Sequence, residues 1–149
     1  MANPVCEVLL TEDELALPNE RADSTVGAVL DFSGVISEYE KGRKIIGIEY
    51  EAHRAMAQHQ LTIIGTEAAQ KFELQRVIIQ HRLGFVPVGE PSLLLRVAAK
   101  HRAEAFQAGQ WIVDELKKKA PIWKHFRFET KHDRVENELQ VDENLVSHK

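Results

Sequence analysis

The chain has 149 residues, 44% of them hydrophobic, and a formal net charge of -4, which argues against general nucleic-acid binding. A single domain of this length buries roughly two-thirds of its unfolded surface and needs no metal or disulfide to stay folded. With one cysteine, Cys6, and no stretch near the ~18 apolar residues of a membrane span, we expect a soluble, unprocessed protein of a reducing compartment, the cytoplasm.

The first part of the chain predicts two strands separated by a loop. Residues 26–32 alternate between apolar and polar positions, which is the period of a half-buried strand. Residues 38–44 are polar and contain a glycine, so they predict a mobile loop. Residues 45–50 predict the second strand, with three side chains on one face: Ile46, Ile48 and Tyr50.

A helix and two further strands follow. From residue 52 to 72 the apolar side chains recur at spacings of three and four, which indicates an amphipathic helix. Residues 76–83 and 92–99 are rich in Val, Ile and Leu and predict two strands. Residues 84–91, with two glycines and two prolines, predict a long turn between them.

The last predicted elements complete a mixed fold. Residues 101–118 predict a second helix, which Pro121 ends because the residue before a proline avoids helical angles. Residues 122–130 predict a strand, and the acidic residues 135–149 predict a loosely held tail after a single domain of residues 1–134. Strands and helices do not alternate regularly, which favours an α+β sandwich over a doubly wound parallel sheet.

Basic side chains are concentrated late in the chain. Residues 101–134 hold eight Lys/Arg against five acids, although the whole chain is acidic. Such a region can attract a small anion, and a solvated basic face is the plainer alternative. No Gly-rich phosphate loop, Gly-x-Ser-x-Gly turn or His-Glu-x-x-His pair is present, so this basic region is the main candidate for chemistry.

Several of these side chains flank the second predicted helix. His101 and Arg102 stand at its start, where free backbone N–H groups favour a bound anion. The plainer alternative is a surface His-Arg pair at a helix start that binds no ligand. Residues 117–119 are lysines at its end, where cations offset the helix dipole. Lys124 follows a stiff apolar stretch that could hold its ammonium against a pocket wall, where a lysine can stabilise a developing anion.

Two other reactive residue types have structural interpretations. His81 shares a strand face with apolar side chains, which is typical of a hydrogen-bonded core histidine. Cys6 lies between valines without a basic neighbour, which indicates an inert buried thiol rather than a nucleophile.

An ordered set of blocks between residues 26 and 124 resembles the family of large, catalytic subunits of molybdopterin synthase. The blocks are residues 27–34, residues 48–51 with Met56-Ala57, and residues 81–90. The most specific block runs through residues 101–124, with His-Arg at its start and Ala-Pro-Ile-Trp-Lys at its end.

The resemblance implies an α/β-hammerhead fold with a mostly antiparallel sheet and two main helices. It implies a homodimer in which each copy binds one small ubiquitin-like sulfur carrier, giving a heterotetramer. The carrier's Gly-Gly tail, ending in a thiocarboxylate, would enter a pocket and supply sulfur to cyclic pyranopterin monophosphate, forming the dithiolene of molybdopterin. It implies a sulfurtransferase without a cofactor or metal of its own.

The resemblance also implies roles for individual residues. Lys117 matches the family lysine beside the carrier's terminal glycine, and Lys124 matches a second pocket lysine. His101 and Arg102 match the site for the substrate phosphate and pterin, and Arg134 resembles a downstream basic residue that would bind substrate.

The chain departs from the family pattern at one charged position. Ser37 stands where the family usually has an arginine after the Phe-x-Gly turn. Arg43, Lys44 or a residue of the other subunit would then have to supply the missing charge. A carrier-binding or regulatory homologue with impaired catalysis is therefore the alternative, and an anion-binding domain unrelated to sulfur transfer is a third possibility.

Overall fold

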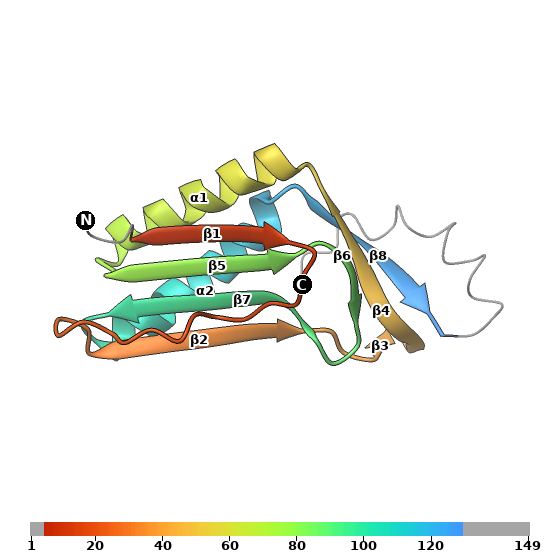
Figure 1. Cartoon of the computed structure of the whole chain (residues 1–149), viewed down its shortest axis with the longest axis horizontal. Coiled ribbons are helices and arrows are strands. Elements are labelled where there is room, and N and C mark those ends of the chain that lie inside the picture. The colour runs from red at the N-terminus through yellow and green to blue at the C-terminus, as the bar shows by residue number, and fades with distance from the viewer. Residues whose placement is uncertain (1–4, 130–149) are drawn as a thin grey trace.

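The computed structural model describes residues 5–129, which form two sheets and two helices (Figure 1). The first sheet has the order β1-β5-β7-β2, in which β1 is parallel to β5 and the other neighbours are antiparallel. Its strands are β1 (Cys6–Thr11), β2 (Ala28–Val35), β5 (Arg76–Arg82) and β7 (Pro91–Ala99). The predicted α+β class, mostly antiparallel with two main helices, is confirmed.

Both helices pack against the first sheet and against each other (Figure 1). They are α1 (Arg54–Lys71) and α2 (Arg102–Lys119), and neither is long and apolar enough to cross a membrane. Each has its buried side chains at spacings of three and four, which places one stripe on the sheet. The core between them is built from completely buried side chains: Leu61, Ile79, Leu95, Val97 and Ile112.

Glycines let the helices approach this sheet closely. Gly65 weakens α1 by about 1 kcal/mol relative to alanine, but a Cβ there would collide with the sulfur of Cys6. A Cβ on Gly109 of α2 would lie 2.6 Å from Cδ2 of Leu30. Burial raises the pKa of the partly buried Cys6, which disfavours the reactive thiolate.

The second sheet lies across one end of the first (Figure 1). Its central strand is paired antiparallel with all three of its neighbours. The strands are β3 (Tyr39–Glu40), β4 (Arg43–Ala52), β6 (Gly84–Pro87) and β8 (Ile122–Phe128), with β4 in the centre. A second, smaller cluster of buried side chains packs here, including Ile48, Val86 and Phe126.

Three local predictions for this part of the chain are wrong. Residues 38–44, expected to be a mobile loop, contain β3 and the turn of its hairpin with β4. Residues 84–91, expected to be one long turn, contain β6, which pairs with β4. A bulge between Ile45 and Gly47 shifts the alternation of β4, so Ile45 is buried and Ile46 is 49% exposed instead of sharing a face with Ile48.

The N-terminal strand β1 was not predicted at all. The predicted domain boundary at residue 134 and the predicted tail, residues 135–149, lie outside the described residues, as does Arg134.

Candidate active site

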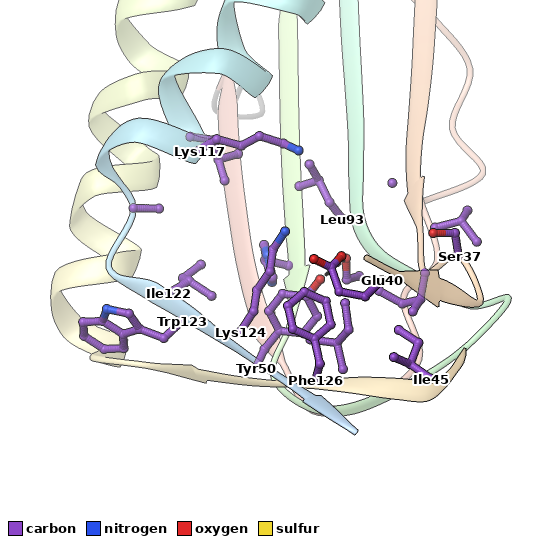
Figure 2. A pocket seen from close by; sticks show the side chains of 18 of the residues that line it. Ser37, Glu40, Ile45, Tyr50, Leu93, Lys117, Ile122, Trp123, Lys124 and Phe126 are labelled. Carbon is purple, nitrogen blue, oxygen red and sulfur yellow. Dashed lines mark hydrogen bonds between the residues drawn. The ribbon is translucent and has the colours of Figure 1, made fainter. Parts of the chain in front are cut away.

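A cavity of about 490 Å³ lies where the two sheets meet the C-terminal end of α2 (Figure 2). Its wall combines the end of β2, the β3 hairpin, β4, and the last turn of α2 with the following strand β8. The lining includes four ionisable side chains that matter for its chemistry: Glu40, His81, Lys117 and Lys124.

Two ammonium groups enter the cavity from different elements. Lys117 comes from the last turn of α2, and Lys124 comes from β8, where it is paired with Tyr50 of β4. Figure 2 shows both side chains extending into the same space. Burial lowers the pKa of Lys124, the charge of Lys117 lowers it further, and the carboxylate of Glu40 partly offsets both effects. Two cations in a partly dry site favour the binding of an anion between them.

The floor of the cavity is polar but uncharged. The hydroxyl of Tyr50 donates to Oγ of Ser92 at 3.1 Å, and its ring packs edge-on against His81 with centroids 5.0 Å apart. Nδ1 of His81 lies 2.8 Å from the carbonyl oxygen of Arg82, which can only accept, so Nδ1 carries the proton and Nε2 is the acceptor. Burial lowers the pKa of His81 to about 4, so the ring is neutral at physiological pH.

The structural interpretation of His81 is therefore confirmed, but the sequence did not place it in the cavity wall. The sequence pattern of β5 predicts that His81 is on a buried face of the strand. It does not show that this face borders the cavity.

Glu40 is a charged residue of the wall that the sequence analysis missed. It follows Tyr39, which also lines the cavity but is 55% exposed, whereas Glu40 is half-buried. The turn beyond it has positive φ at Lys41 (51°) and Gly42 (80°), as a two-residue hairpin requires. The Lys-Gly pair between a tyrosine-containing stretch and an apolar strand was the signal that could have predicted this hairpin.

His101 and Arg102 do not line this cavity. They stand at the start of α2, where the side chain of His101 is 74% exposed and its Nδ1 is 4.0 Å from Glu104. At 1.5 Å per residue, the helix separates them from Lys117 by roughly 23 Å. Within one chain, the cations at the two ends of this helix therefore lie at separate places.

The remaining predicted residues are divided between the cavity and the outside. Ser37 lines the cavity, whereas Arg43 does not, because its guanidinium lies over the ring of Phe128, 3.9 Å from the centroid. Lys119 pairs with Glu115 at 2.7 Å, which fits the plain helix-end interpretation of that lysine. Arg134 lies outside the described residues.

A family model described as "MoaE protein" matches residues 10–119. The chain belongs to the MoaE family. The match includes Lys117 and ends before Lys124.

Relatives named molybdopterin synthase catalytic subunit support the assignment to MoaE. The protein of Pyrococcus abyssi is 41% identical over 113 residues, covering 76% of this chain and 74% of that one. The human protein is 39% identical over 98 residues, which are 66% of this chain and 52% of that one. This MoaE chain thus spans about half the length of its human relative.

Solved structures agree with the fold of this MoaE chain. The molybdopterin synthase of Staphylococcus aureus superposes with a TM-score of 0.69 at 33% identity, covering 72% of this chain and 79% of that one. A complex of subunits 1 and 2 of the molybdopterin-converting factor of Helicobacter pylori includes a chain with a TM-score of 0.62 at 19% identity, covering 86% and 91% respectively. The second likeness shows the fold alone.

Proposed function

We propose that this MoaE chain is the catalytic subunit of a cytoplasmic molybdopterin synthase, a sulfurtransferase. It would take sulfur from the C-terminal thiocarboxylate of a small carrier protein and add it to cyclic pyranopterin monophosphate. The observation that carries the proposal is the pair Lys117 and Lys124, which extends into one cavity at the end of α2.

The cavity wall suits a thin anionic tail. A Gly-Gly terminus has no side chains beyond its backbone, so it can enter a narrow space between two sheets. The ammonium groups of Lys117 and Lys124 stabilise the thiocarboxylate and the negative charge that builds as sulfur leaves it. Neutral Tyr50, His81 and Ser92 provide hydrogen-bonding atoms without an opposing charge.

The phosphate of the pterin needs a further site. We assign it to His101 and Arg102, where the N-terminus of α2 and a guanidinium suit phosphate oxygens. Because these residues are far from Lys117 in one chain, the assignment requires a second copy to bring them to the cavity, and so it requires a homodimer. Ser37, Arg43 and Arg134 remain proposed substrate contacts.

Substitution of Lys117 tests the enzymatic role. The purified chain, a thiocarboxylated carrier and the pyranopterin should together yield molybdopterin, and Lys117→Ala should lower the rate at least about 100-fold because a charge facing the reacting group is lost. Lys119→Ala is the matched control, since it removes a lysine that pairs with Glu115. Full activity of Lys117→Ala would refute the catalytic assignment.

A second candidate function is favoured by Ser37. This uncharged residue lines the cavity where the family resemblance leads us to expect an arginine. A homologue with too little positive charge would bind the carrier and regulate the pathway without catalysis. Normal carrier binding without product at saturating substrate would support this alternative.

A further inference from the structure

The carboxylate of Glu40 is the feature of the cavity that anion binding does not explain. The other charged side chains considered above, Lys117 and Lys124, attract a negative ligand, whereas Glu40 repels it. Nevertheless Glu40 is half-buried in the cavity wall, whereas its neighbour Tyr39, which also lines the cavity, is 55% exposed. Figure 2 shows the Glu40 carboxylate and the Lys124 side chain approaching the same space above the rings of Tyr50 and Phe126.

We infer that Glu40 is an internal counter-ion of the cavity, which balances Lys124 while the site is empty and which an entering anion must displace from that role. The inference rests on the proposed function, because the entering anion is the end of the carrier tail. Glu40 would then weaken tail binding and favour release of the spent carrier, whose tail is still negatively charged after sulfur transfer.

The surroundings of Lys124 support this role. Lys117 and Lys118 face the cavity from α2, Tyr39 and Glu40 from β3, Tyr50 from β4, and His81 from β5. Burial raises the pKa of Tyr50 and lowers that of His81, so both are neutral at physiological pH. Within residues 5–129, Glu40 is thus the acidic side chain of the wall that faces the lysines.

Glu40 acts on Lys124 through its charge. The carboxylate raises the pKa of Lys124 through its charge, against the larger opposing effects of burial and of Lys117. A counter-ion that forms no hydrogen bond with its partner can be replaced without breaking one. An entering carboxylate or thiocarboxylate can therefore replace Glu40 as the charge partner of Lys124.

Glu40→Gln in the full-length chain tests the inference through two readouts. The first is the titration of the Lys124 ammonium in the protein alone, followed by NMR of isotope-labelled lysine and assigned by loss of the signal in Lys124→Arg. The second is the affinity for a synthetic peptide ending in Gly-Gly with a free carboxylate. Glu38→Gln is the matched control, because Glu38 is exposed, lies two residues away and does not line the cavity.

We expect Glu40→Gln to lower the pKa of Lys124 and to tighten peptide binding about three- to tenfold, because a like charge near the bound anion is removed. Glu38→Gln should leave both unchanged. An unaltered Lys124 titration overturns the inference, and so does peptide affinity that is unchanged or weaker. A wild-type chain that binds no peptide would count against the proposed function, while the titration would still decide the role of Glu40.

Discussion

The two hydrophobic clusters of this molecule differ in how completely their side chains fill the space around them. The larger one fills the space between the first sheet and both helices, with fourteen buried side chains among the described residues. The smaller one has seven, and several of them, including Ile48 and Phe126, also form the wall of the cavity. The first cluster holds the chain together, and the second shapes a hollow at its edge.

This difference shows where the fold can form a ligand site without disturbing the main core. Dense packing on all sides leaves no room for a ligand, whereas the junction of two sheets leaves space that side chains fill only partly. Charged groups can reach that space from α2, β3 and β8 without crossing the main core. The comparison predicts that substitutions in the two clusters act on different properties.

The largest expected effect is on the main cluster. Ile112→Ala should lower the free energy of unfolding by about 2–5 kcal/mol, because Ile112 is completely buried and the truncation leaves a cavity. Activity per folded molecule should be unchanged. Denaturant unfolding together with a molybdopterin assay measures both quantities. Ile46→Ala, at a 49% exposed position, is the control, and a loss of activity in folded Ile112→Ala would break the comparison.

A somewhat smaller effect is expected from pH at His81. Its pKa is about 4 in the folded chain and about 6.5 when unfolded, so below pH 6.5 the unfolded state binds a proton that the folded state does not. The stability contributed above pH 6.5 is therefore lost as the pH falls to about 4, by up to about 3 kcal/mol. Comparing unfolding of the wild type and of His81→Gln at pH 7 and pH 4.5 isolates this contribution. Equal losses in the two proteins would show that His81 does not titrate as a buried group.

The smallest expected effect concerns Ser37. Ser37→Arg adds a positive charge to the cavity wall and should tighten binding of the carrier tail by about two- to fivefold, with less benefit at high salt. Titration calorimetry at two salt concentrations measures it. Glu38→Gln also raises the net charge by one, at an exposed neighbour, and is the control. If both variants behave alike, general charge rather than the cavity is responsible.

Periodicity predicted the elements around the main cluster except β1. Both helices and the strands β2, β5 and β7 carry long apolar patterns, because each buries a regular face against the same core. The second sheet was predicted less completely. Its hairpin strand β3 has only two residues, and the bulge in β4 reverses which of Ile45 and Ile46 is buried, so neither leaves a regular pattern.

The candidate site was only partly predictable for a related reason. The resemblance identified Lys117 and Lys124, and both line the cavity. Glu40 was missed because its inward direction depends on a turn of two residues, Lys41 and Gly42. Arg102 and Lys117 stand at opposite ends of α2, so the sequence alone does not show whether they belong to one site.

The pairing of β8 with β4 has a consequence for the order in which the chain folds during its synthesis. His125 contacts Glu51 across a separation of 74 residues, so this wall forms only after both helices and the first sheet have been synthesised. Such distant pairing is slow to form because a long loop must close first. A chain that stops before residue 122 would already contain the residues of the main core but would lack β8, the strand that carries Lys124 and completes the cavity wall.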